Sequence, residues 1–163
     1  MPPTSKESKQ VPEIPEGLSS TGCRCAIVAS RFNAHIVDRL VDGALEAFAD
    51  TGTGSNEVKL VRVPGAFELP LAVQHLAEAS DYDAIVALGC VIRGETPHFE
   101  HVSRTAADGL ARVSLELGIP VAFGVLTTET VDQAMARAGG DAGNRGFDAA
   151  IAAIEMIHQL RDI

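Results

Sequence analysis

The sequence predicts an α/β fold in which helices cover both faces of a parallel sheet, a three-layer α/β/α arrangement. Four short segments are apolar at nearly every position, which is typical of strands buried on both faces. The segments between them carry apolar residues at steps of three and four, the spacing of a helix that covers one face of a sheet. The two kinds of segment alternate along the chain, as βα units of a parallel sheet require.

The predicted elements follow one another in regular order. The apolar strands, from first to last, are 26–29, 58–63, 84–92 and 121–126. The helices that follow them run from Asn33 to the glycines at 52–54, over 68–78, over 97–117, from Thr130 to the glycines at 139–143, and from Asn144 towards the C-terminus. Four parallel strands with five helices therefore make up the predicted fold.

The helix boundaries depend on side chains that cap or interrupt a helix. Four helices begin after a short polar side chain that can accept a hydrogen bond from the first turn: Asn33, Thr96, Thr130 and Asn144. Pro97 follows in the first helical position, where a missing N–H costs nothing, and Pro70 is confined to a first turn. Gln133 lies three residues after Thr130, the spacing of a capping box.

Length and composition limit the organisation of the chain and its partners. With 163 residues, of which 46% are hydrophobic, the chain can bury one core. Residues 1–20 are polar and contain several prolines, so we expect an N-terminal tail followed by one domain at 21–163. The net charge of -9 argues against a nucleic acid or an anionic membrane as a partner, because either would need a basic surface.

Compartment and redox chemistry are predicted from what the chain lacks. No apolar run approaches the roughly 20 residues needed to span a bilayer, and residues 1–16 lack the apolar core of a signal peptide. We therefore expect a cytoplasmic protein. Three cysteines do not indicate a disulfide framework.

One segment, 89–102, carries most of the chemical information. It starts at the end of a strand, continues as a glycine-containing loop and reaches a helix N-terminus at Thr96-Pro97. Unpaired N–H groups and the positive end of the helix dipole favour an anion such as phosphate there. His98 lies just inside the helix, and histidine is the side chain best suited to move protons near neutral pH. The segment predicts a phosphate site beside an acid/base histidine.

Several functions that share this architecture are disfavoured by missing motifs. The glycine pattern of dinucleotide-binding domains does not follow the first strand, and no phosphate loop ends in Gly-Lys-Ser or Gly-Lys-Thr. The strand ends lack the acidic cluster of a phospho-acceptor module and the Ser/Thr/Gly-rich loop of a flavin-binding electron carrier. His98 and His101 with Glu95 could ligate a metal, but spacing provides no third strong ligand, so we expect none.

Five segments, taken in order, identify a family. They are Arg31-Phe32-Asn33, Val-Pro-Gly-Ala-Phe-Glu-Leu-Pro at 63–70, Val-Ile-Arg-Gly-Glu-Thr-Pro-His-Phe at 91–99, Gly-Val-Leu-Thr-Thr-Glu at 124–129, and Arg137-Ala-Gly through Gly-Asn-Arg-Gly at 143–146. In order and spacing they resemble the 6,7-dimethyl-8-ribityllumazine synthase family, and the resemblance covers 22–163. With it, the expected fold is a three-layer α/β/α domain with a four-stranded parallel, flavodoxin-like sheet.

The resemblance implies a transferase of riboflavin biosynthesis, acting at the penultimate step. Its small-molecule substrates are 5-amino-6-(D-ribitylamino)uracil and 3,4-dihydroxy-2-butanone 4-phosphate, which condense to the lumazine with release of phosphate and water. The steps are mostly proton transfers and positioning, so no metal or organic cofactor is needed. Riboflavin synthase is a candidate protein partner.

The resemblance also assigns residues to the phosphate-bearing substrate. His98 matches the acid/base histidine, while Glu95 and Thr96 match positions that hold the phosphate through backbone N–H groups. Arg137 matches the cation that pairs with this phosphate, where a bidentate guanidinium fits well. Without the resemblance, Arg137 would be interpreted as an ordinary solvated arginine on a helix.

Other matched positions contact the pyrimidine and its ribityl chain. These substrate-binding residues are Phe32, Asn33, Ala66, Phe67, Glu68, Cys90, Val91 and Ile92, with Phe123 supplied by an adjacent subunit. Phe32 matches the ring that stacks on the pyrimidine, although in isolation it would be interpreted as a core residue. Glu68 matches an acceptor of ribityl hydroxyls, and it is also the kind of acid that a helix dipole favours in a first turn. Cys90 is more simply a small apolar wall residue than a nucleophile.

The assembly and two functional alternatives are left open by the sequence. The family's shared pocket implies a homo-oligomer, at least a pentameric ring. The short 139–143 segment resembles the same segment in members that build icosahedral shells of pentamers, whereas Pro12 and Pro15 would weaken the pairing of an N-terminal segment with a neighbour's sheet edge.

The two alternative functions are a non-catalytic protein that binds lumazine or flavin and a structural cage subunit. His98 together with Arg137 disfavours a simple binder, which would need neither.

Overall fold

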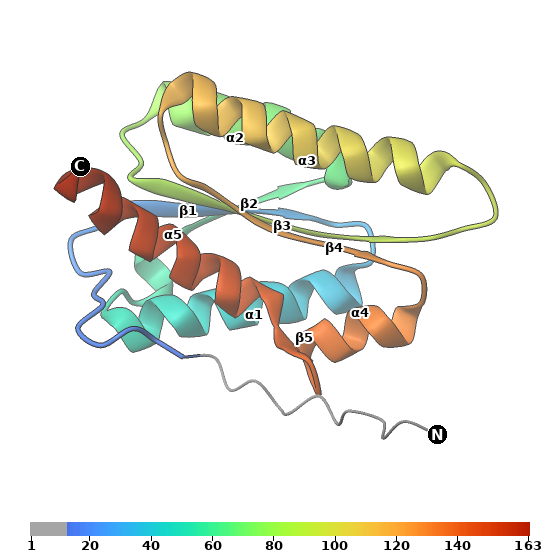
Figure 1. The fold of residues 1–163 in the computed structure, drawn as a ribbon, viewed down its shortest axis with the longest axis horizontal. Coiled ribbons are helices and arrows are strands. Elements are labelled where there is room, and N and C mark those ends of the chain that lie inside the picture. The colour runs from blue at the N-terminus through green and yellow to red at the C-terminus, as the bar shows by residue number, and fades with distance from the viewer. Residues whose placement is uncertain (1–12) are drawn as a thin grey trace.

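Four parallel strands form the middle layer of the fold, seen in a computed structural model that describes residues 13–163 (Figure 1). They are β1 (Cys25–Ser30), β2 (Lys59–Val63), β3 (Ala84–Ile92) and β4 (Val121–Thr128). Their order across the sheet is β2-β1-β3-β4. In register, Ser30 of β1 lies opposite Val63 of β2, and Ala29 lies opposite Leu88 of β3. The carboxyl ends of the strands therefore reach one edge of the sheet.

Helices cover both faces of this sheet (Figure 1). One face carries α1 (Ala34–Thr51), α4 (Val131–Arg137) and α5 (Arg145–Asp162), and the other carries α2 (Leu69–Ala79) and α3 (His98–Leu117). Short elements join them: the 3₁₀ turns η1 (Ser55–Glu57) and η2 (Ala66–Glu68), and the small hairpin of β5 (Ala138–Gly140) and β6 (Gly143–Asn144). The predicted three-layer α/β/α fold with a four-stranded parallel, flavodoxin-like sheet is confirmed.

The central strands β1 and β3 contribute side chains alternately to two cores. Ile27 and Val86 are buried in the cluster that includes α1 and α5, whereas Val28 and Ile85 are buried in the cluster that includes α2 and α3. All four side chains are fully buried. Because both of their faces are covered, these two strands must be apolar at successive positions, which is the pattern that predicted them. The edge strand β2 differs: Lys59 and Leu60 are exposed, and its buried Val63 belongs to the cluster that includes α2 and α3.

Two of the predicted caps are confirmed. The Oδ1 atom of Asn144 accepts hydrogen bonds from the N–H groups of Gly146 (2.8 Å) and Phe147 (3.1 Å) at the start of α5. Thr130 Oγ1 accepts a bond of 3.1 Å from the N–H of Gln133 at the start of α4. The Gln133 side chain does not close the capping box on Thr130, because its Oε1 atom accepts from the preceding Glu129 N–H at 2.8 Å.

Two other predicted caps were wrong. Asn33 precedes α1 but adopts a left-handed backbone with φ of 60°, and its side chain makes no cap hydrogen bond. Instead its Nδ2 atom donates to the carbonyl of Cys90 at 3.0 Å. Helix α3 begins at His98 with Pro97 in the N-cap position, one residue later than expected, so Thr96 belongs to the loop. At Asn33 the bond to Cys90 thus replaces the expected cap.

The described part of the predicted tail packs on the domain. Ile14 and Leu18 lie against the core that includes α1 and α5, and a turn joins the Leu18 N–H to the Pro15 carbonyl at 3.1 Å. Ser20 is fully buried, and its hydroxyl accepts a hydrogen bond of 2.9 Å from Thr51 at the end of α1. The expectation for Pro12 falls on residues 1–12, outside the described part of the chain.

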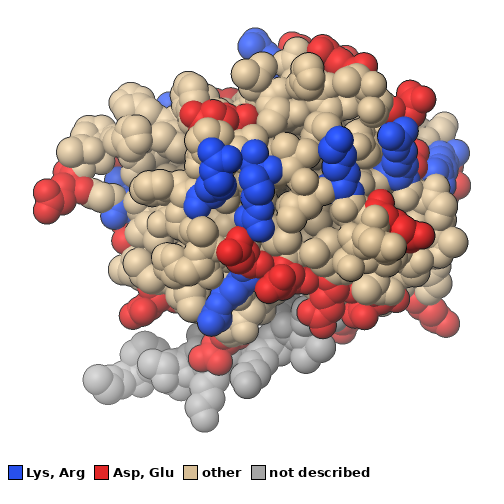
Figure 2. Space-filling model, turned by 180° about the vertical axis from the view of Figure 1, so that it is seen from behind, with Lys and Arg blue, Asp and Glu red and all other residues tan. Residues whose placement is uncertain are grey.

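Surface charge is mixed on the face seen in Figure 2. Several Lys and Arg side chains form a row across this face, and Asp and Glu side chains gather below the row. A basic row bounded by carboxylates gives that face no broad basic surface of the kind that nucleic acids require. Among residues 13–163, no helix combines the length and the apolar content needed to cross a membrane.

Candidate active site

A cavity of about 540 Å³ opens where the carboxyl ends of β1, β2 and β3 meet the start of α3. Its lining residues come from three strand ends and one helix: Phe32, Pro64, Gly65, Ala66, Phe67, Glu68, Cys90, Val91, Ile92, Gly94, Thr96, His98, Phe99 and Val102. Open α/β sheets bind their ligands outside the carboxyl ends of the strands, and the cavity lies at that place. The cavity is large enough for a small organic molecule.

Hydrogen bonds between loops fix the walls of this cavity. The N–H groups of Arg31 and Phe32 donate to the carbonyls of Val63 and Pro64 at 2.8 and 3.0 Å, so the loop after β1 follows the loop after β2. The Asn33 side chain then ties the same loop to the end of β3 through the Cys90 carbonyl. Three strand ends are thus held together by backbone and amide groups, which leaves the Phe32 ring free to face outward.

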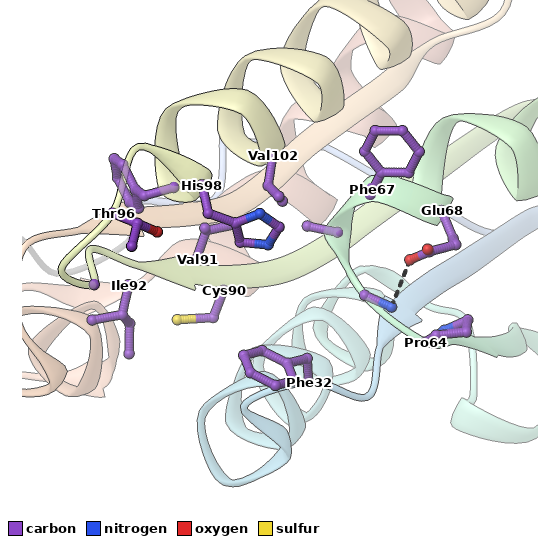
Figure 3. Close-up of a pocket in the computed structure, with 14 residues that line it drawn as sticks. Phe32, Pro64, Phe67, Glu68, Cys90, Val91, Ile92, Thr96, His98 and Val102 are labelled. Carbon is purple, nitrogen blue, oxygen red and sulfur yellow. Dashed lines mark hydrogen bonds between the residues drawn. The ribbon is translucent and has the colours of Figure 1, made fainter.

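Two phenylalanine rings border the cavity (Figure 3). Phe32 is 70% exposed and Phe67 is 57% exposed, although apolar rings of this size are normally buried in a monomeric domain. The interpretation of Phe32 as a core residue is therefore wrong. Exposed rings at the mouth of a cavity provide flat faces on which a planar heterocycle can stack.

The opposite end of the cavity is suited to an anion and to proton transfer. Gly94 and Thr96 line it just before α3, where the N–H groups of His98 and Phe99 precede the first helical hydrogen bond, which runs from the Glu100 N–H to the Pro97 carbonyl. The positive end of the helix dipole adds to their attraction for a negative group. In Figure 3 the His98 imidazole points into the cavity between Val91 and Val102. An anion at this helix end and a proton-transferring histidine would be neighbours.

Similarity to known proteins agrees with this geometry. The family model for 6,7-dimethyl-8-ribityllumazine synthase matches residues 22–161. A protein of that name from Syntrophus aciditrophicus (strain SB) is 51% identical over 154 residues, which cover 94% of this chain and 100% of the relative. Another from Chlorobium phaeovibrioides (strain DSM 265 / 1930) is 48% identical over 152 residues, 93% of this chain and 98% of the relative. The chain belongs to the 6,7-dimethyl-8-ribityllumazine synthase family. The family predicted from five sequence segments is confirmed.

Most of the site residues predicted from the lumazine synthase family lie together in the cavity. Nine of the predicted residues line it: Phe32, Ala66, Phe67, Glu68, Cys90, Val91, Ile92, Thr96 and His98. Glu68 Oε2 accepts a hydrogen bond of 2.9 Å from the Gly65 N–H, so this carboxylate stabilises the 3₁₀ turn η2 as well as facing the cavity. A carboxylate held in this way is positioned to accept hydrogen bonds from ligand hydroxyls.

Cys90 lies in the cavity wall as a neutral thiol. Burial raises the pKa of its thiol to about 11. Because the thiolate is the nucleophilic form, this cysteine is inert near neutral pH. The expected role of Cys90 as a small apolar wall residue fits this environment.

Four predicted residues do not line the cavity of their own chain. Asn33 contacts the Cys90 carbonyl, and Glu95 is an exposed loop residue. Phe123 lies on the edge strand β4, 48% exposed, and Arg137 ends α4, where its Nη1 atom donates to the Gln133 carbonyl at 3.0 Å. Within one chain, therefore, the arginine expected to bind phosphate is not at the phosphate end.

The cavity also includes residues that the sequence did not assign to the site. These are Pro64, Gly65, Gly94, Phe99 and Val102. Val102 lies four positions after His98 on α3, so helical spacing alone could have placed it on the same face. Phe99 carried no comparable signal, because it is adjacent to His98 and its ring reaches the cavity from the helix start. Within residues 13–163, no three His, Cys, Asp or Glu side chains lie close enough together to hold a metal ion.

Proposed function

We propose that this protein condenses 5-amino-6-(D-ribitylamino)uracil with 3,4-dihydroxy-2-butanone 4-phosphate to 6,7-dimethyl-8-ribityllumazine, with release of phosphate and water. The proposal depends on one arrangement: a cavity with exposed phenylalanine rings at its mouth and with His98 at the helix N-terminus of its other end. This arrangement occurs in a chain of the lumazine synthase family. The two ends match a planar pyrimidine and a phosphate ester.

Different residues of the cavity bind the pyrimidine, its ribityl chain and the phosphate. Phe32 and Phe67 stack on the pyrimidine, and the fixed Glu68 carboxylate accepts hydrogen bonds from the ribityl hydroxyls. The loop before α3 binds the phosphate through the N–H groups of Glu95 and Thr96. A glutamate side chain would repel phosphate, which is why the exposed Glu95 acts through its backbone.

His98 moves protons while the two substrates are held close together. The pyrimidine amine attacks the butanone carbonyl, water is lost to form a Schiff base, and the phosphate then leaves. Loss of the proton from the carbon that carries the hydroxyl expels the phosphate and leaves an enol, which tautomerises to a new carbonyl at that carbon. The second amine attacks this carbonyl, and loss of another water closes the ring. Each step adds or removes a proton on nitrogen, oxygen or carbon, and His98 supplies that transfer from the phosphate end.

A neighbouring copy of the chain completes the site in this proposal. Arg137 and Phe123 lie away from the cavity of their own chain, and both present surface to solvent. In a cyclic pentamer they would face the His98 end of the adjacent subunit, in a ring of heterologous contacts that closes by rotation. We propose a pentamer as the minimum active unit, which assembles into an icosahedral shell in the cytoplasm. Light scattering tests the assembly: a particle of one pentamer's size rejects the shell, and a monomer rejects the shared site.

The activity is tested by mixing the purified protein with both substrates. Formation of the lumazine is followed by its long-wavelength absorbance and fluorescence, with the uncatalysed reaction subtracted. The proposed function predicts turnover well above that background. Binding of the lumazine without turnover would instead support the non-catalytic alternative, which the family match does not favour.

A further inference from the structure

Arg93 occupies the point where the phosphate-binding loop leaves β3, and its contacts reach three elements. Its N–H donates to the Thr128 carbonyl at the end of β4 at 2.9 Å. Its Nε atom donates to Glu129 Oε2 at 2.7 Å, and Nη1 lies 3.5 Å from Glu100 Oε1 in the first turn of α3. The guanidinium carbon lies 4.5 Å from the centre of the Phe99 ring. No other role in the site uses this arginine.

These contacts occupy the Arg93 guanidinium group with partners from its own chain. Two carboxylates and one aromatic face surround it, so Arg93, Glu129 and Glu100 together carry more negative than positive charge. An arginine that bound phosphate directly would have to give up at least one of these partners. The geometry therefore separates Arg93 from the phosphate cation, although it is the arginine next to the loop.

One of the groups that Arg93 touches lines the phosphate end of the cavity, and the other two lie beside it in the sequence or through a contact. Phe99 lines the cavity beside His98, and Glu100 belongs to the same helical turn. Glu129 is itself fixed, because its N–H donates to the side chain of Gln133 in the first turn of α4 at 2.8 Å. The Arg93–Glu129 pair thus links the start of α3 to the start of α4.

We infer that Arg93 is a positioning residue, which holds the 94–97 loop and the Phe99 ring in place through its pairing with Glu129. This inference rests on the proposed function, since the loop is the site of the substrate phosphate. It excludes Arg93 as a direct phosphate ligand. The pair is partly exposed, with side-chain exposures of 39% and 59%, so its loss should change the geometry of the loop more than the stability of the fold.

The inference is tested by whether Glu129→Gln strengthens or weakens phosphate binding. By Coulomb's law alone, removal of a negative charge close to an anion site strengthens anion binding. If Glu129 acts by holding Arg93 in place, the variant instead weakens binding, because the loop loses its geometry. We expect the Kd for inorganic phosphate, and the KM for the butanone phosphate, to rise about fivefold, the factor that one ordinary hydrogen bond represents.

Two further variants complete the experiment on the intact assembled protein. Arg93→Lys keeps the charge but loses the planar fork and the stacking on Phe99, so it should weaken phosphate binding in the same direction. Glu116→Gln is the matched control, because Glu116 pairs with Arg112 at 3.4 Å towards the far end of α3 and its loss should leave phosphate binding unchanged. The KM for the pyrimidine should stay within a factor of about two in all three variants.

The outcomes separate the inference from the proposed function. Tighter phosphate binding in Glu129→Gln would show that a freed Arg93 binds the anion directly, and this overturns the inference. Unchanged binding in both Arg93→Lys and Glu129→Gln overturns it as well and leaves the pair a purely structural one. A wild-type protein that neither binds inorganic phosphate nor forms the lumazine rejects the proposed function, and the inference with it.

Discussion

The bond from Asn33 to Cys90 offers a test of how the cavity walls are held. The Asn33 side chain donates to the Cys90 carbonyl at 3.0 Å, and within residues 13–163 it is the one non-glycine residue with a positive φ, 60°. Asparagine tolerates this left-handed conformation better than alanine does. Asn33→Ala therefore removes a hydrogen bond and adds backbone strain at the same position.

The expected loss is the sum of these two effects. A partly buried hydrogen bond contributes about 1 kcal/mol to the free energy of unfolding, and the left-handed backbone costs an alanine about 1 kcal/mol. Asn33→Ala should then destabilise the protein by about 2 kcal/mol, which corresponds to a fall in Tm of about 4–8 °C for a chain of this length. Asn33→Gly loses the hydrogen bond but tolerates a positive φ, so its loss should be about half as large.

Thermal unfolding of the three proteins measures both effects. All three are compared at the same concentration, because oligomerisation makes Tm depend on concentration. Wild type, glycine variant and alanine variant should unfold in that order of decreasing Tm. An alanine variant as stable as wild type would refute the account of how the ends of β1 and β3 are tied. Equal losses for glycine and alanine would show that the backbone conformation contributes nothing.

Two further predictions concern the chemistry of the cavity. His98→Ala should leave fold and assembly intact and slow turnover about 10²-fold, because one acid/base group is lost; a rate unchanged after background subtraction contradicts the assignment. Arg137→Ala should raise the KM for the butanone phosphate far more than the KM for the pyrimidine, because a charge-assisted bidentate partner of the phosphate is removed. Equal weakening towards both substrates would mean that Arg137 only supports the fold.

The central strands β1 and β3 could be predicted from the sequence because burial on both faces makes composition itself the signal. The strand 84–92 has the predicted bounds, and no segment predicted to be a strand is a helix. The fourth strand was the least well bounded: it continues to Thr128, two residues past the prediction, because Thr128 pairs in register with Ile92. Such pairing depends on a neighbour that the local sequence does not contain.

The capping prediction for Asn33 failed because its side chain makes a tertiary contact instead. Asn33 and Asn144 look alike in the sequence, yet Asn144 caps its helix while Asn33 bonds to a different strand. A similar limit applies to Gly146, which the sequence shows only as a glycine after a cap. In the structure a Cβ atom there would collide with the backbone of Leu40, so this glycine permits α1 and α5 to approach closely.

The candidate site was predictable to the extent that its residues are close together in sequence. Cys90 to His98 form one strand end, loop and helix start, and their placement around one cavity follows from the parallel sheet. The contacts of Arg93 were not predictable in the same way. They join β3, α3 and the end of β4, and no pattern within one segment marks the pairing with Glu129.

A mixed assembly of His98→Ala and Arg137→Ala subunits tests most directly whether the active site is shared between two copies of the chain. Each variant alone should be slow, because every site lacks one of the two groups. In a ring assembled from equal amounts of both, about one quarter of the sites should combine an intact His98 with an intact Arg137 from the neighbour. We predict lumazine formation at up to about a quarter of the wild-type rate. A mixture that is no faster than the separate variants would contradict the account.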